Sequence, residues 1–208
     1  MSKIVILLLF YNLHLLISCP ISNHAPLIIQ DTMASPQARS LQTTVTIQPI
    51  RILFDFSNYP DPTTLPILNS TISDVQNTLQ SILSVPRFWG NMTLQSNNCN
   101  TAIVPQYIQT TGIPADLAVF ITSQTVEGME SLEAWSTPCS INPLALNRVN
   151  FAQLNILPSK VGTDTYMWSQ LYETLLHEMI HILGFNPILF QYFVDSNGNA
   201  LGVSNIIM

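Results

Sequence analysis

The chain has 208 residues, a formal net charge of −6 and only six lysines and arginines. This length suits one domain, and a composition of 47% hydrophobic against 9% charged residues excludes an intrinsically disordered chain. The acidic balance argues against nucleic acid as a partner, because nucleic-acid binding requires a basic surface.

The first residues have the pattern of a secretory signal peptide. Lys3 precedes an apolar run from Ile4 to Ile17, and Ser18 offers a small residue at a cleavage site. Polar residues interrupt the run, which is also short for a membrane span. A buried core helix and a bacterial lipoprotein signal ending at Cys19 are the alternatives. We predict a signal peptide over residues 1–18.

Residues 19–44 are predicted to form a pro-segment or an extended arm. This segment is poor in aromatic residues and contains Pro20, Pro26 and Pro36. The remainder, residues 45–208, is expected to form the folded body of the protein.

Secretion determines how the two cysteines of the body are interpreted. An even pair in an oxidising compartment favours a disulfide between Cys99 and Cys139, with two free buried thiols as the alternative. Two Asn-x-Thr sequons, at Asn69 and Asn91, are candidate glycosylation sites and agree with a secretory route. We therefore predict a secreted protein or one on the cell surface.

The first half of the body shows a strand pattern followed by a helix pattern. Ile50, Ile52 and Phe54 recur at every second position and so share one face, which predicts a strand over residues 45–56. Apolar residues then recur at intervals of three and four over 68–83, which predicts a helix that Asn69 or Ser70 caps and that ends before Pro86.

The middle of the chain is predicted to contain two strands between irregular segments. Residues 116–122 form a compact apolar run typical of a buried strand, whereas 87–115 and 123–147 lack a regular pattern. Residues 148–156 alternate between apolar and polar side chains, which indicates a strand at the edge of a sheet. An edge strand there could pair with an extended peptide substrate.

A second long helix is predicted to begin near residues 163–165 and to end at Gly184, with Pro187 preventing its continuation. Its apolar residues, from Trp168 to Ile182, should bury it on most sides. Downstream, residues 193–203 are predicted to form a hairpin around an Asn-Gly turn.

This second helix contains the sequence His177-Glu178-Met179-Ile180-His181. Residues four apart on a helix share one face, so both imidazoles can reach one Zn²⁺ ion while Glu178 serves as the general base. In the alternative interpretation the two histidines are core residues that bond to the main chain. Gly184 follows His181 by three residues, as in the longer pattern H-E-x-x-H-x-x-G.

The third zinc ligand is not evident in this sequence. A catalytic zinc normally holds three protein ligands and a water. Pro187 occupies the position where compact metzincins have a histidine, and no glutamate follows Glu178. Asp195 is the carboxylate that remains downstream. Cys19 and His24 lie in the segment predicted to be removed.

The chain resembles the leishmanolysin family of metallopeptidases over residues 46–208. The segments that carry the resemblance share the family's spacing: Pro49-Ile50-Arg51-Ile52, Ala115 to Phe120, Ala134 to Cys139, and His177 to Phe185. The resemblance implies an α+β fold of the metzincin type, with a small mixed sheet, two long helices and the zinc motif on the second helix.

The resemblance also implies that His177 and His181 bind one zinc ion, that Glu178 is the general base, and that proteins or peptides are the substrates. In this family a long insertion separates the motif glycine from the third zinc-binding histidine. On that comparison the chain is expected to hold the N-terminal catalytic subdomain and to end inside the insertion. Family members also have a pro-segment cysteine that caps the zinc, but Cys19 does not reproduce that pattern, and no role is assigned to it.

Two functional classes follow from these observations. The first is a secreted or cell-surface zinc metalloendopeptidase, with membrane association as a further expectation. The second is a truncated, inactive relative that acts as a binding or adhesion module, or a fragment without function.

Overall fold

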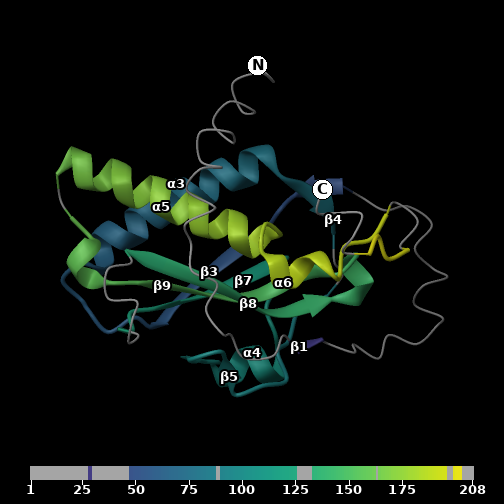
Figure 1. Cartoon of the computed structure of the whole chain (residues 1–208). Helices are drawn as coiled ribbons and strands as arrows, with labels where there is room; N and C mark the ends of the chain where they lie inside the picture. Colours follow the sequence, from purple (N-terminus) through teal and green to yellow (C-terminus); the bar gives the residue numbers. More distant parts are fainter. Residues whose placement is uncertain are drawn as a thin grey trace, which may run out of the picture.

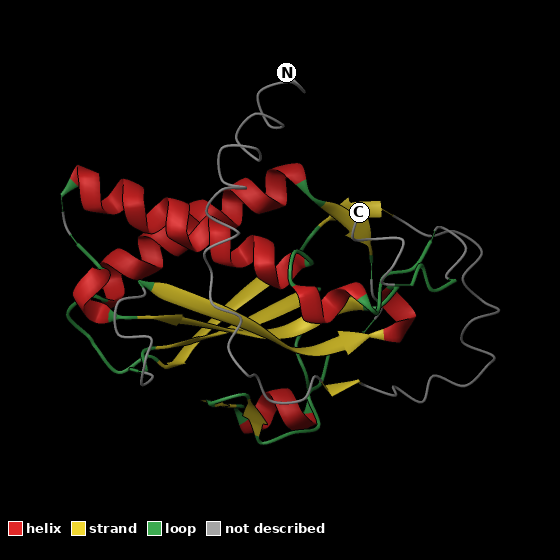
Figure 2. Cartoon of the chain, in the orientation of Figure 1, coloured by secondary structure: helices red, strands yellow, loops and turns green. Residues whose placement is uncertain are grey.

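The computed structural model describes residues 28–29, 47–87, 90–125, 133–162, 164–195 and 199–202. They form an α+β fold in which two long helices cover one face of a mixed sheet and a layer of short elements covers the other (Figures 1 and 2). The predicted fold class is therefore confirmed. The predicted signal peptide and most of the predicted arm lie outside the described residues. Within those ranges, no helix is long and apolar enough to cross a membrane.

The central sheet has five strands in the order β1-β8-β9-β7-β3. Strand β3 is parallel to β7, β7 is parallel to β9, β8 is antiparallel to β9, and β1 is parallel to β8. The strands span Ile28–Ile29 for β1, Ile52–Asn58 for β3, Leu117–Thr122 for β7, Ala134–Asn142 for β8 and Arg148–Ile156 for β9. Every residue of β7 and β8 is buried, as expected for strands covered on both faces.

Two predictions for this sheet are wrong. The segment 123–147 was expected to be irregular, but it contains β8, whose nine residues include Pro138. The register of the β8–β9 pair shifts on both sides of Ser140, so bulges accommodate the proline within the strand. Strand β9 was expected at a sheet edge, but it pairs with β7 on one side and β8 on the other. It therefore offers no free edge to a substrate.

Helices α3 (Leu65–Ile82) and α5 (Thr165–Leu183) lie together above the sheet in Figure 1. They are joined by the hydroxyl groups of Thr78 and Tyr172, 2.8 Å apart. Helix α3 begins earlier than predicted, because Pro66 occupies the first turn and Thr64 is the N-cap residue. Most of the apolar stripe is confirmed, since Leu68, Ile72, Val75 and Leu79 are buried.

Short elements complete the helix side of the fold. The strand predicted over residues 45–56 is divided into β2 (Ile47–Pro49) and β3, and β2 pairs with β4 (Ser84–Pro86) just after α3. One-turn 3₁₀ helices span Pro143–Ala145 and Pro158–Lys160, and α6 spans Pro187–Phe190. In the predicted hairpin, Val194 pairs with Ala200, while the turn residues 196–198 lie outside the described ranges.

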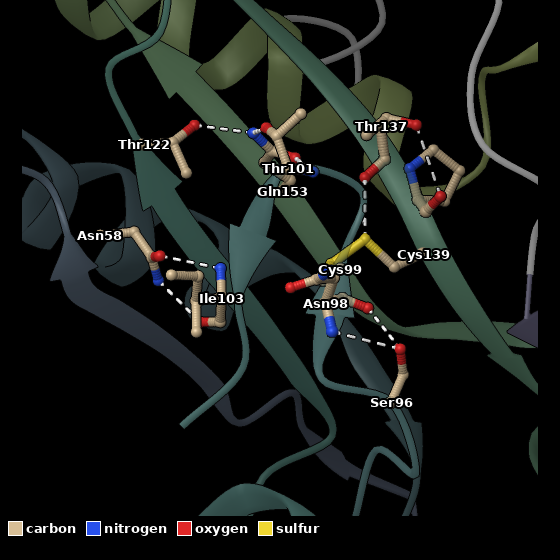
Figure 3. The surroundings of a disulfide bond; sticks show 11 residues. Asn58, Ser96, Asn98, Cys99, Thr101, Ile103, Thr122, Thr137, Cys139 and Gln153 are labelled. Carbon is tan, nitrogen blue, oxygen red and sulfur yellow. Dashed lines mark hydrogen bonds between the residues drawn. A yellow bond between two sulfur atoms is a disulfide. The ribbon is translucent and has the colours of Figure 1, made fainter. Parts of the chain in front are cut away.

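The opposite face of the sheet is covered by β5 (Asn98–Cys99), β6 (Ala102–Ile103) and α4 (Gln106–Thr110). The predicted disulfide between Cys99 and Cys139 is present and ties this layer to β8 (Figure 3). The layer buries a second apolar cluster whose sheet residues include Phe120 and Phe151. Side chains on this face of the sheet are therefore enclosed, which explains why Gln153 and Asn155 of β9 do not contact solvent.

The ends of three strands meet at a buried ion-pair cluster around Asp116. The carboxylate of Asp116 accepts hydrogen bonds from the main-chain N–H, Nε and Nη2 of Arg51 at 2.9 to 3.1 Å. Arg87 and Arg148 lie 3.8 and 3.9 Å from the same carboxylate. Burial tends to raise the pKa of Asp116, but the hydrogen bonds and charge of Arg51 outweigh it, so the pKa is lowered. The cluster joins β3, β7 and β9 at one end.

Candidate metal centre

The helix that carries the H-E-x-x-H sequence has defined ends. Asp164 caps its start, with Oδ1 accepting a hydrogen bond from the main-chain N–H of Met167 at 2.9 Å. Gly184 ends it at a φ of 149°, a conformation that favours glycine. The predicted boundaries of this helix are confirmed. One detail differs, because Trp168 is not buried but is 38% exposed and stacks on Tyr172.

The two histidines of the motif approach each other on one side of α5. Their Nε2 atoms are 3.1 Å apart, and the rings are nearly perpendicular, at 84° with centroids 4.7 Å apart. Both side chains are half-buried. Burial, with the neighbouring His181 imidazole adding to it, lowers the pKa of His177 and favours the neutral ring that binds metal ions.

The main chain after the helix determines the tautomer of His181. Its Nδ1 atom lies 2.7 Å from the carbonyl oxygen of Phe185. A carbonyl can only accept, so Nδ1–H is the donor, and Nε2 of the neutral ring keeps its lone pair. Gly184 allows the turn that brings this carbonyl back to the ring. The contact is therefore a hydrogen bond of the kind that orients metal-binding histidines.

The separation of the two Nε2 atoms fits a single zinc ion. Two nitrogens bound to tetrahedral zinc at about 2.0–2.1 Å lie about 3.3 Å apart, close to the observed 3.1 Å. His177 and His181 thus match two of the ligand positions of such a site. Among the described residues, however, no group of three or more His, Cys, Asp or Glu side chains could hold a metal ion.

The remaining candidates do not complete this set in the described structure. The carboxylate of Asp195 accepts hydrogen bonds from the main-chain N–H and the side-chain Nδ2 of Asn199, at 2.9 and 3.1 Å. These two contacts are those of a turn residue. Cys19 and His24 lie outside the described ranges.

Glu178 is buried beside the two histidines, with 3% of its surface exposed. Its Oε2 atom is buried and has no hydrogen-bond partner. Burial raises the pKa of the Glu178 carboxyl, although a hydrogen bond from the Ser136 hydroxyl, the electrostatic effect of the His181 imidazole and a hydrogen bond from the Ser136 main-chain N–H act in the opposite direction. A raised pKa and an unpartnered oxygen are properties of a carboxylate that receives and releases a proton.

Two contacts of this site were not anticipated from the sequence. The hydroxyl of Ser136, on β8, donates to the main-chain oxygen of Glu178 at 3.0 Å, and the Phe185 carbonyl accepts from His181. Ser136 is 42 residues before Glu178 in the chain. No local pattern signals such a contact, and the sequence of residues 134–142 does not indicate a strand.

The other predicted site residues lie away from this centre. Asn69 is exposed on α3, and Asn91 is exposed with its Nδ2 donating to the carbonyl of Thr111 at 3.0 Å. Both glycosylation sites stay predictions.

A helix that presents two close imidazoles and a buried carboxylate against a mixed sheet defines a class, the metal-dependent peptidases. A model of the leishmanolysin family matches residues 64–200, and the chain belongs to this family. A search of curated proteins finds no matching relative. Membership confirms the resemblance seen in the sequence.

Proposed function

We propose that the protein is a secreted or cell-surface zinc metalloendopeptidase that hydrolyses peptide bonds in proteins. The observation that carries the proposal is the 3.1 Å approach of the His177 and His181 Nε2 atoms beside the buried Glu178 carboxylate. Family membership supports the class of reaction. The proposal requires a third zinc ligand that is not among the residues that the structure describes.

His177 and His181 would hold the ion through Nε2. Zinc would supply a Lewis acid that polarises the scissile carbonyl and lowers the pKa of water. Glu178 accepts a proton from the attacking water and transfers it to the leaving amine nitrogen as the C–N bond breaks. The Phe185 carbonyl keeps the His181 ring in the required tautomer throughout.

Strand β8 is the place where an extended substrate would pair. It contacts the Glu178 turn through Ser136, and its outer edge pairs with β1 only at Ser140 and Ile141. Within the described ranges, the rest of that edge has no strand beside it. A peptide added there would lie next to α5 and form main-chain hydrogen bonds of the sheet type.

Secretion is supported by three features. The sequence of residues 1–18 has the signal-peptide pattern. The Cys99–Cys139 disulfide is of the kind that persists in oxidising compartments. The two sequons have exposed asparagines. Attachment to a membrane or to the cell surface is proposed from the class of protein alone.

The proposal is tested by the metal content and proteolytic activity of the purified chain. We expect one zinc per chain by atomic emission, and cleavage of casein that a chelator stops and added Zn²⁺ restores. Glu178→Ala should retain zinc and lose cleavage. Glu173→Ala, a matched change at an exposed position of the same helix, should retain both.

The opposite result separates the two functional classes. A chain that binds Zn²⁺ weakly, in the micromolar range or above, and leaves casein intact would contradict the enzyme and favour an inactive binding or adhesion module. Cleavage that survives Glu178→Ala would place the activity elsewhere.

A further inference from the structure

The hydrogen bond from Ser136 to Glu178 is unusual for a helix interior. The main-chain oxygen of a helical residue normally accepts from the N–H four residues further on, here Ile182. Ser136 Oγ is a second donor to the same oxygen, at 3.0 Å. Ser136 and Glu178 are 8% and 3% exposed, so solvent competes little for this contact.

This contact is directional, whereas most of the packing around it is not. Leu175, Met179 and Ile182 of α5 lie in the apolar cluster above the sheet. Apolar packing sets the distance between a helix and a sheet, but it resists sliding and rotation less specifically than a hydrogen bond does. The Ser136 bond fixes the turn that contains Glu178 against one residue of β8.

Ser136 also lies against the Glu178 carboxyl itself, whose pKa its hydroxyl and its main-chain N–H lower through hydrogen bonds. The Oε2 atom of Glu178 has no hydrogen-bond partner, so at that oxygen nothing within the described structure holds the carboxylate. The position of the carboxylate then depends on Ser136 in two ways, through the main-chain oxygen of residue 178 and through the carboxyl group.

We propose that Ser136 is a positioning residue that fixes the Glu178 turn of α5 against β8 and so places the general base beside the two histidines. This inference rests on the proposed function. Ser136 acts through the main chain and the carboxyl of Glu178 and need not touch the substrate or the metal. It would therefore affect the rate of the chemical step more than the binding of substrate or zinc.

The neighbouring residue of β8 supplies a matched control. Thr137 is 1% exposed, and its hydroxyl bonds to the carbonyl of Pro138 at 3.4 Å rather than to α5. Figure 3 shows Thr137 near the disulfide and Cys139. Thr137→Val therefore removes a buried hydroxyl from the same strand without removing a contact to Glu178.

The experiment compares Ser136→Ala, Ser136→Thr and Thr137→Val in the full chain. Zinc content, kcat and KM on a fluorogenic peptide, and melting temperature are measured for each. We expect Ser136→Ala to lower kcat about tenfold, the effect of one hydrogen bond, with KM and zinc content unchanged. Ser136→Thr keeps a hydroxyl and should restore kcat, and Thr137→Val should match the wild type.

Two results would overturn the positioning role. The first is an unchanged kcat in Ser136→Ala. The second is an equal loss of kcat in Ser136→Ala and Thr137→Val that follows the loss of melting temperature, because this would show general destabilisation of β8.

A separate measurement decides the inference if the wild-type chain proves inactive. Carboxyl-¹³C glutamate labelling should give one narrow Glu178 signal, assigned by its absence in Glu178→Gln, in the wild type and in Ser136→Thr. A broadened or doubled signal in Ser136→Ala supports positioning even without catalysis. An identical signal in all three proteins rejects it, whatever becomes of the peptidase assignment.

Discussion

Buried polar side chains on the two faces of the sheet differ in how completely they are hydrogen-bonded. On the disulfide face, the Gln153 amide is fully engaged: Oε1 accepts from the main-chain N–H of Thr101, and Nε2 donates to the hydroxyls of Thr101 and Thr122, at 2.7 to 3.1 Å (Figure 3). On the helix face, Glu178 is as deeply buried, but its Oε2 has no partner.

Under the proposed function, this difference separates a polar group that stabilises the fold from one that takes part in the reaction. A buried polar atom without a partner costs the fold about 1–3 kcal/mol, and more when it carries charge. Gln153 avoids that cost and joins the small layer to the sheet. Glu178 bears it, which is expected of a group whose free oxygen must exchange a proton with a substrate or water.

Replacing Glu178 with Gln should have the largest effect and should separate activity from stability. We expect kcat/KM to fall by about 10²–10⁴, the usual contribution of a general base. The melting temperature should stay the same or rise, because the substitution removes a buried ionisable carboxyl. Peptide hydrolysis and thermal unfolding of the same preparations measure both.

Gln153→Met provides the contrasting change on the other face. It leaves the Thr101 N–H and the Thr122 hydroxyl without their bonds to this side chain and should cost about 1–3 kcal/mol of stability. Activity of the folded variant should be retained. If Glu178→Gln proved the more destabilising of the two, the distinction between the faces would be wrong.

The disulfide should stabilise its face without forming part of the metal centre. Its cysteines are 40 residues apart in sequence. Closing a loop of this size stabilises the fold by about 4 kcal/mol in the chain-entropy model. We expect the double variant Cys99→Ser with Cys139→Ser to lose about that much in urea unfolding.

Zinc binding provides the second measurement on this double variant. Below its unfolding transition, it should bind Zn²⁺ with wild-type affinity, because His177 and His181 are on the helix above the opposite face of the sheet. Loss of zinc binding in the folded variant would show that the two faces are coupled.

The sequence predicted the helix face better than the disulfide face for a physical reason. The boundaries of α5 depend on local signals, the Asp164 cap and the Gly184 stop, and the spacing of the two histidines depends only on helix geometry. These signals act within a few residues, so a pattern search finds them.

Strand β8 was not predicted, and β9 was predicted over the correct residues but at a sheet edge, because the environment of both strands is set by distant segments. The polar residues of β9, such as Gln153 and Asn155, alternate like a solvent-exposed face, but they are buried and bonded to neighbouring segments. Strand β8 is buried on both faces and contains Pro138, so neither alternation nor propensity indicates a strand. The contacts of Ser136 and Phe185 with the metal centre depend on this tertiary arrangement.

Gly184→Ala should affect stability and metal binding together. A Cβ at this position has space, since its nearest neighbour is Phe193 Cζ at 3.6 Å, so the cost comes from the φ of 149°. We expect about 1–3 kcal/mol of destabilisation. Any relaxation of the turn would move the Phe185 carbonyl from His181 and lower zinc affinity about tenfold or more.

Isothermal titration with Zn²⁺ and thermal unfolding measure these two effects. Gly162→Ala is unsuitable as a control, because its Cβ would clash with Met167. Gly90→Ala is suitable, since Gly90 also has positive φ and an open surrounding. It should lose stability without losing zinc affinity. Equal zinc affinity in the wild type, Gly184→Ala and Gly90→Ala would contradict the proposal that the Phe185 carbonyl orients His181.

The smallest effect is expected at the start of α5, where stability and chemistry should be fully separate. Asp164→Ala removes the cap bond to Met167 and should cost about 1 kcal/mol, or about 2–4 °C in melting temperature. Asp164→Asn retains an acceptor and should lose less. His177 lies 13 residues further along, about 20 Å of helix, so zinc affinity and kcat should not change in either variant. A change in zinc affinity on Asp164→Ala would mean that fraying at the start of α5 extends to His177 and His181 near its other end. Packing of α5 against β8 would then not be enough to stop the fraying.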